Sequence, residues 1–166
     1  MLRVTTMIKF GIVLVAAGLL AACSSTKEEA PAPVAQVPTS SITPGSAEDF
    51  RVNVGDTVFF DLNQYSVRPD AQAILQKQAA WLKQYPSVKL LVEGHCDERG
   101  TREYNLALGD RRAYAVKEFL TSMGVDAARL QTKSYGKERP VCADSDESCW
   151  QQNRRGYSVI SSGAGS

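Results

Sequence analysis

The chain has 166 residues, of which 43% are hydrophobic and 22% are charged, and its formal net charge is only +1. This composition leaves room for one folded domain with a single core. A charge so close to zero provides no strong field for nucleic acid or anionic lipid, so recognition must depend on local groups.

The first 23 residues have the pattern of a lipoprotein signal. Arg3 and Lys9 precede an apolar stretch, residues 10–20, which suits a signal peptide and is too short for a membrane span. Small residues then lead to Cys23, the order of a lipobox. We expect residues 1–22 to be a cleaved signal peptide and the Cys23 thiol to carry diacylglycerol. The alternative is an ordinary cleaved signal with a free Cys23.

Residues 23–49 have no apolar period and contain four prolines among Ala, Ser and Thr. They are expected to form the lipidated N-terminus and a flexible tether with a reach of roughly 25 to 30 Å. Residues 50–162 then make up the domain, and residues 163–166 a short flexible tail.

Apolar spacing predicts the elements of this domain. Residues 51–60 alternate as a strand does, with Thr57 to Phe60 as the first strand proper. Residues 69–85 repeat apolar side chains at helical spacing, with Pro69 suited to the first turn. A short apolar strand, residues 88–92, follows.

A second helix is expected over residues 101–123, with Thr101 as its N-cap and Gly124 as its stop. Strands around residues 130–135 and 157–161 complete the set. The sequence therefore predicts an α/β fold, an α+β sandwich in the order β-α-β-α-β-β. Its helices pack on one face of a mixed four-stranded sheet.

A polar run, residues 94–113, lies between two apolar segments and has the character of a site rather than of a core. The strand before it delivers Asp97, and the helix after it carries Arg112 beside the apolar stripe, between Leu108 and Val116. A guanidinium next to a core needs an acceptor, and Asp97 is the nearest acid by topology. The pair is expected either to hold a zwitterionic ligand or to form only an internal salt bridge.

Residues 92–120 resemble the OmpA-like domain and, within it, the peptidoglycan-associated lipoproteins. The similarity rests on the string GHCDERGTREYNLALGDRRA, with a strand-end Asp, a loop with Gly, then Asn, Leu and Arg-Ala on the helix, and extends over about residues 52–160. Domains of that family bind the diaminopimelate residue of peptidoglycan stem peptides without covalent bonds. The resemblance implies that Asp97 takes the ligand ammonium and that Arg112 takes a carboxylate.

The resemblance also implies the other walls of the pocket. Phe60 and Asp61 would form one wall, and the loop side would consist of Gly100, Thr101, Asn105 and Leu106.

Location and partners follow from the same resemblance. It implies a third acyl chain on the new amine of Cys23 and a periplasmic head on an outer-membrane lipoprotein, which Ser24, in place of an Asp, also favours. It further implies membership of the Tol-Pal system, which acts in envelope integrity and cell division and in which TolB competes with peptidoglycan for an overlapping surface. The alternative is a lipid-anchored, wall-binding head that serves another envelope machine for secretion or motility.

The remaining cysteines suit an oxidising compartment. Cys142 and Cys149 flank a short acidic loop, so we expect a disulfide between them, with two reduced thiols as the alternative. Cys96 is expected to be a packed free thiol.

Metal binding and catalysis are not expected. His95, Cys96 and Asp97 all have ligating groups, but neighbouring strand residues point to opposite faces, and no paired ligands occur elsewhere. His95 is instead expected to be a hydrogen-bonded residue at the strand end. Glu93 and Asp97 share one strand face at a spacing that would suit a glycan hydrolase, yet an arginine beside Asp97 would lower its pKa, which is wrong for a general acid. No cofactor is expected apart from the acyl chains.

A basic pair, Arg154 and Arg155, follows Asn153 near the end of the chain. The pair resembles the opening of the family's last strand, and a solvated basic pair is the alternative.

Overall fold

The computed structural model describes residues 42–165. The expected signal peptide, Cys23 and most of the tether lie outside these residues. These described residues belong to one compact unit. No helix within residues 42–165 is long and apolar enough to cross a bilayer.

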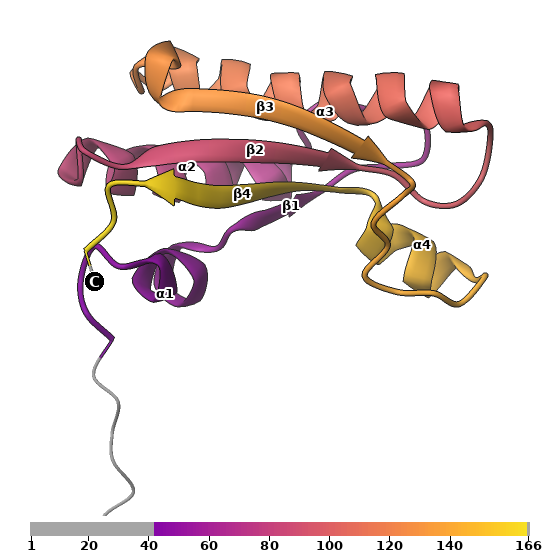
Figure 1. The fold of residues 1–166 in the computed structure, drawn as a ribbon, viewed down its shortest axis with the longest axis horizontal. Helices are drawn as coiled ribbons and strands as arrows, with labels where there is room; N and C mark the ends of the chain where they lie inside the picture. The colour runs from indigo at the N-terminus through magenta and orange to yellow at the C-terminus, as the bar shows by residue number, and fades with distance from the viewer. Residues whose placement is uncertain (1–41, 166) are drawn as a thin grey trace, which may run out of the picture. The chain divides into compact units, whose positions relative to one another are not determined.

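Four strands form one mixed sheet in the order β1-β4-β2-β3 (Figure 1). Their bounds are Thr57–Phe59 for β1, Lys89–His95 for β2, Leu130–Gly136 for β3 and Arg155–Ser162 for β4. Strands β2 and β3 run parallel, whereas β4 is antiparallel to both of its neighbours. The mixed four-stranded sheet confirms the expected fold class.

Two long helices make the connections within this sheet and cover the same face of it (Figure 1). They are α2, Pro69–Gln84, between β1 and β2, and α3, Arg102–Ser122, between β2 and β3. Thr101 caps α3, because its hydroxyl accepts the Tyr104 N–H at 3.2 Å. Gly124, at φ +88°, follows the end of that helix in the left-handed conformation expected of a helix stop.

The core fills the space between this face and the helices. Alternate residues of β2, Leu90 and Val92, are fully buried there. Their partners are apolar side chains on the inner faces of α2 and α3, among them Leu75, Leu82, Val116 and Leu120. The opposite face of the sheet carries Lys89, Gln131 and Lys133, which are exposed. One face of the sheet is therefore buried in the core, and the other faces solvent.

The backbones of α3 and β2 approach each other closely at Gly94 and Gly109. A Cβ atom on Gly94 would overlap the carbonyl oxygen of Gly109, and one on Gly109 would come within 2.8 Å of the Gly94 oxygen. The site residues on α3 therefore depend on two glycines for their distance from the sheet.

Replacing Gly94 with alanine should lower the free energy of unfolding by about 2 to 3 kcal/mol, because the added methyl must push the helix away from the strand. Urea unfolding measures this loss. Gly165→Ala, where an added Cβ meets nothing nearer than 3.9 Å, is the matched control and should leave the midpoint unchanged. Equal midpoints for all three proteins would show that α3 can shift without cost.

The start of the domain differs from its prediction as a strand. Phe50–Val54 forms a short π-helical turn, and strand pairing begins only at Thr57. Phe50 is buried against Trp81, with ring centroids 4.9 Å apart, and this packing outweighs the local alternation. Gly55, at φ +92°, ends the turn.

The ordered region is also wider than the expected range of 50–162. A short helix, α1, Ala47–Asp49, precedes the π-helical turn, and Asp49 accepts a hydrogen bond from the Trp81 indole at 2.8 Å. The expected tail is held as well, since Gly165 N donates to Gly45 O at 3.1 Å.

Two further elements were not predicted. A single 3-10 turn, Ala127–Arg129, precedes β3, and a short helix, α4, Glu147–Asn153, lies between β3 and β4. In Figure 1, α4 stands at the end of the sheet where β2 and β3 finish. This is also the end that carries the polar run.

Candidate functional site

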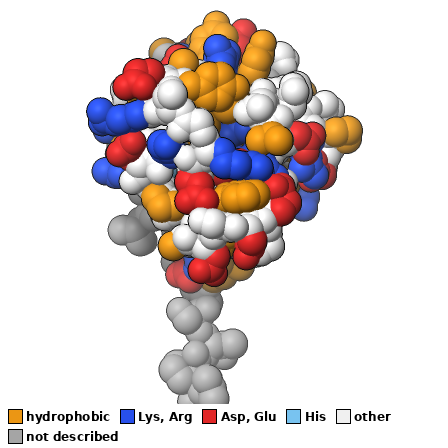
Figure 2. Space-filling model, turned by 90° about the vertical axis from the view of Figure 1, so that its right-hand side faces the viewer, with side chains coloured by type: hydrophobic (Ala, Val, Ile, Leu, Met, Phe, Trp, Pro, Cys, Tyr) orange, Lys and Arg blue, Asp and Glu red, His pale blue; other side chains and the backbone are white. Residues whose placement is uncertain are grey.

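The polar run forms a tight loop between the end of β2 and the start of α3. Gly100 takes φ +85°, and the buried Asn105 amide donates to the carbonyls of Arg99, at 2.8 Å, and Thr101, at 2.9 Å. Asn105 therefore closes the loop rather than facing a ligand. Figure 2 looks onto this end of the domain, where acidic and basic side chains alternate with apolar ones.

Asp97 is a buried carboxylate held by two arginines, and its residue is only 5% exposed. It accepts from Arg99 at 2.6 Å (Nη2) and 3.2 Å (Nε), and from Arg154 at 3.2 Å (Nη1). Burial opposes the charged form of Asp97, but the hydrogen bonds from Arg99 and Arg154 and from the Arg99 backbone outweigh it and lower the pKa. Asp97 is therefore a fixed anion at neutral pH.

Arg112 does not pair with Asp97, so the alternative of an internal salt bridge between them is wrong. Its buried guanidinium instead donates to three backbone carbonyls, those of Gln64 (Nε, 2.8 Å), His95 (Nη1, 2.8 Å) and Asp61 (Nη2, 3.0 Å). The loop after β1 passes over α3 and presents its carbonyls to the guanidinium fork, so no carboxylate is required. The two charges share one end of the sheet but have separate partners.

The expected walls of the pocket are only partly correct. Phe60 is fully buried with its ring centroid 5.2 Å from the Arg112 guanidinium, so it supports the site from below and does not line it. The Asp61 side chain turns outward to Arg68, at 3.0 Å, and contributes its backbone oxygen alone. Leu106 is 50% exposed on α3.

A shallow pocket, here called the loop pocket, lies between the loop after β1 and the loop after β2. It has a volume of about 320 Å³ and is lined by Leu62, Asn63, Arg99, Gly100 and Tyr104. Of these residues, only Gly100 was predicted as part of the site. Asn63 has φ +56°, which a non-glycine residue adopts rarely. An Asn in the sequence Leu-Asn-Gln is the one signal that could have marked this turn, since Asn tolerates that conformation.

Helix α4 buttresses the site from the side. Cys142 and Cys149 are joined by a disulfide at its base, as the sequence predicts. The Trp150 ring lies under the Arg99 guanidinium, 4.0 Å from it, and the indole N–H donates to Glu98 at 3.0 Å. The guanidinium of Arg154 donates to Glu147 and, at 2.6 Å, to Gln151. This short helix therefore positions both arginines that hold Asp97.

Residues 59–154, more than half of the chain, match the model of the OmpA family. The chain belongs to the OmpA family.

Its relatives within that family are peptidoglycan-associated lipoproteins. The chain is 54% identical over 156 residues to that of Mesorhizobium japonicum, which covers 93% of this chain and 92% of the relative. It is 61% identical over 125 residues to that of Agrobacterium fabrum, which covers 75% and 70%. The crystal structure of the peptidoglycan-associated lipoprotein from Burkholderia pseudomallei matches with a TM-score of 0.62 and 48% identity over 63% of this chain and 89% of that chain. The predicted resemblance is confirmed, and the relatives bear the name of a lipoprotein and not of an enzyme.

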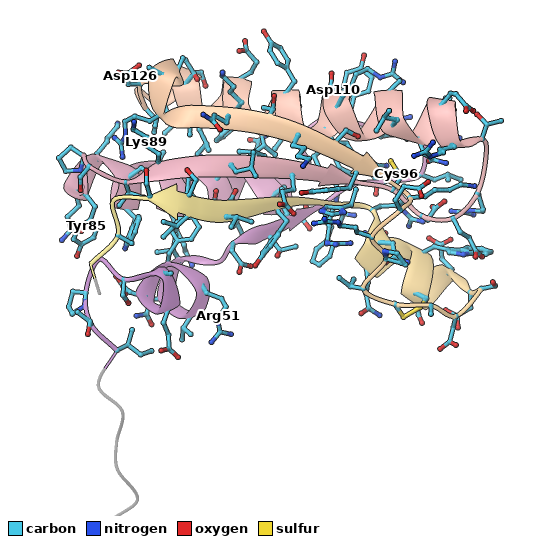
Figure 3. All side chains as sticks on the ribbon, in the orientation of Figure 1. Arg51, Tyr85, Lys89, Cys96, Asp110 and Asp126 are labelled. Carbon is cyan, nitrogen blue, oxygen red and sulfur yellow. A yellow bond between two sulfur atoms is a disulfide. The ribbon has the colours of Figure 1, made fainter. Side chains whose placement is uncertain are left out.

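The side chains of His95, Cys96 and Asp97, the potential metal-ligating residues at the end of β2, have different surroundings. Cys96, labelled in Figure 3, lies at the end of β2 and is a buried, unpaired thiol whose Sγ is 3.4 Å from the Asn105 carbonyl. His95 stacks on Tyr135 at the other face of the sheet, with centroids 5.4 Å apart. The expectation that His95 is hydrogen-bonded is wrong, because neither ring nitrogen has a hydrogen-bond partner among the described residues. Glu93 approaches to 3.4 Å without the required alignment.

The pKa of His95 falls from 6.5 to about 4, first because the ring is buried and then because Arg155 and Arg139 repel a positive charge. Between these two values the unfolded chain binds a proton that the folded domain does not. The stability of the wild type relative to His95→Phe should therefore decrease as the pH falls from 6.5 to 4. Thermal unfolding at several pH values measures it, and NMR of the single histidine supplies the control. A ring that titrates near pH 6.5 would contradict its burial.

The basic pair near the end of the chain is not solvated. Arg154 and Arg155 are 2% and 7% exposed, and Arg155 begins β4. The structure therefore favours the family-like opening of the last strand over the solvated pair.

Proposed function

We propose that this domain binds diaminopimelate-containing stem peptides of peptidoglycan without covalent bonds, as the head of an outer-membrane lipoprotein that joins membrane to wall. The proposal depends mainly on one observation, the burial of an ionised Asp97 and of the Arg112 guanidinium at one end of the sheet beside the loop pocket. The names of the relatives, which associate those proteins with peptidoglycan and with lipid, support it.

The chemistry of the ligand suits these two charges. The free end of diaminopimelate carries one ammonium and one carboxylate. Asp97 would take the ammonium, because its pKa is lowered and it stays ionised. An arginine has five N–H donors, and Arg112 uses three of them on carbonyls, so two remain for a carboxylate. Since residues 61–64 supply two of the carbonyls that cover Arg112, we infer that this segment shifts when the carboxylate enters.

The proposed location depends on Cys23, which lies outside the described residues. Two or three acyl chains on that residue would give stable anchoring, whereas one chain would be marginal. The Cys142–Cys149 disulfide suits an oxidising compartment such as the periplasm.

We further propose that the protein acts in the Tol-Pal system, with TolB as a partner. This assignment is supported only by the resemblance of the chain to the peptidoglycan-associated lipoproteins. Capture of TolB by the purified chain from an envelope extract, and its release by soluble stem peptide, is the expected result. Capture of a secretion or motility component instead would favour the other envelope machine.

Wall binding is tested by sedimentation with purified peptidoglycan. The mature chain in detergent should co-sediment with diaminopimelate-type peptidoglycan and remain in solution with lysine-type peptidoglycan, because lysine offers the ammonium without the second carboxylate. Equal binding to both walls would remove the carboxylate from recognition, and binding to neither would overturn the proposed function.

A further inference from the structure

Two arginines share the Asp97 carboxylate, but they differ in burial and in attachment. We propose that Arg99 is a displaceable internal cation, which occupies the ammonium position on Asp97 in the empty protein and leaves it when a ligand ammonium binds. Arg154 is the fixed partner that stays. This inference rests on the proposed function and defines how that site selects its ligand.

The fixed role of Arg154 follows from its surroundings. Its side chain is 3% exposed and donates to the Phe60 carbonyl at 3.2 Å, to Gln151 at 2.6 Å and to Glu147, as well as to Asp97. Moving this side chain would break all of these hydrogen bonds at once, and those to the Phe60 carbonyl and to Asp97 are buried, so the loss is costly. Arg154 therefore keeps Asp97 ionised in both states of the site.

Arg99 has the opposite character. Its side chain is 34% exposed, and its hydrogen bonds from the guanidinium all go to Asp97. Arg99 also lines the loop pocket, whereas the buried Asp97 does not. A ligand cation that enters through the loop pocket therefore meets Arg99 before it meets the carboxylate.

A second acceptor for the Arg99 guanidinium lies close to its present position. Glu147 Oε2 already lies 3.8 Å from Nη2, and the Trp150 ring lies 4.0 Å from the guanidinium. A small rotation toward Glu147 keeps the cation–π contact and replaces one carboxylate with another. The exchange leaves the net charge beside Asp97 unchanged, so the carboxylate is never left without its second cation.

This arrangement selects ligands by their ammonium. A stem peptide whose side-chain amine is acylated, as in a cross-link, carries no cation that can replace Arg99 on Asp97. The domain should therefore prefer stem peptides with a free amine, and acylated ones should leave Arg99 in place.

The test uses the mature chain in detergent and a soluble diaminopimelate-containing tripeptide. If Arg99 occupies Asp97 for about nine-tenths of the time, its removal should tighten binding about tenfold. Arg99→Gln removes the charge, and Arg99→Lys, which keeps the charge without the fork, should fall between Arg99→Gln and the wild type. Arg102→Gln is the matched control, since Arg102 pairs with the exposed Glu138, and its affinity should equal that of the wild type.

A spectroscopic measurement separates displacement from a merely structural role. Ligand binding should change the fluorescence of Trp150 in the wild type, because Arg99 moves across its ring, and the change should be absent in Trp150→Phe and in Arg99→Gln. The amine-acetylated tripeptide should produce no change.

The outcomes distinguish the two proposals. Wild-type binding with an equal or weaker affinity of Arg99→Gln would overturn the displacement of Arg99 and leave the proposed function intact. If neither the wild type nor Arg99→Gln binds, the proposed function fails and this inference fails with it. Binding by Arg99→Gln alone would overturn both, because the ligand would then fail to displace Arg99 in the wild type.

Discussion

Asp97→Asn is expected to weaken binding to diaminopimelate-type peptidoglycan by about 100-fold, which corresponds to the loss of one partner of a desolvated charge pair. Asparagine keeps the shape of the side chain but removes the charge that would hold the ligand ammonium. Arg154 would retain its bonds to Phe60, Gln151 and Glu147, so the domain should stay folded. The loss in stability should be about 1.5 to 3 kcal/mol, the range for a hydrogen bond to a charged group.

The measurement is sedimentation with purified peptidoglycan, with thermal unfolding of the same samples to confirm the fold. Asp110→Asn is the matched control, because Asp110 is exposed on the outer side of α3 and points away from the sheet in Figure 3. Its binding should equal that of the wild type. Undiminished binding by Asp97→Asn would mean that Asp97 is structural, and a protein partner would then become the leading explanation of the site.

Arg112→Ala should destabilise the domain by about 3 to 5 kcal/mol. The change removes a buried guanidinium and its hydrogen bonds to the carbonyls of Asp61 and Gln64, in the loop after β1, and of His95, at the end of β2. For a domain of this size we expect the unfolding midpoint to fall by roughly 10 to 20 °C. Arg112→Lys should be more stable than Arg112→Ala but less stable than the wild type. One ammonium cannot reach three carbonyls arranged around a planar fork.

Thermal and urea unfolding measure this effect. Arg111→Ala is the matched control, because Arg111 is the exposed neighbour on α3 whose guanidinium lies 5.5 Å from the Tyr65 ring. That variant should stay within about 1 kcal/mol of the wild type. A midpoint for Arg112→Ala equal to that of the wild type would show that water replaces the guanidinium on those carbonyls.

The expected instability of Arg112→Ala affects how its binding data are interpreted. A binding loss in Arg112→Ala combines a damaged loop with a missing ligand group, so it cannot by itself assign the carboxylate to Arg112. The comparison of diaminopimelate-type with lysine-type peptidoglycan shows whether the ligand carboxylate contributes to binding, and it does so without altering the fold.

The periodic elements were predictable because their cause is local. Helices α2 and α3 carry apolar side chains at helical spacing between a proline or a threonine cap and a stop, and β2 begins with a short apolar run. The disulfide partners flank one short loop, so their pairing also needed little tertiary information.

Elements without a periodic signal were missed. Helix α4 is short and polar, and it is held by the disulfide at its base and by the contacts of Arg154 with Glu147 and Gln151. The turn at Phe50–Val54 has a strand-like alternation, but burial of Phe50 against Trp81 decides its conformation. At Phe50–Val54, a contact with a distant residue outweighs the local preference.

For the site, the sequence alone determined that Asp97 and Arg112 lie at one end of the sheet, because strand direction and helical register are local properties. Only the tertiary structure decided their partners. Arg154 reaches Asp97 across 57 residues because β4 inserts between β1 and β2, and Arg112 meets carbonyls 48 and 51 residues away because the loop after β1 crosses α3. Ion pairs and hydrogen bonds of buried groups are chosen by which acceptors the fold brings within reach, and sequence separation does not constrain that choice.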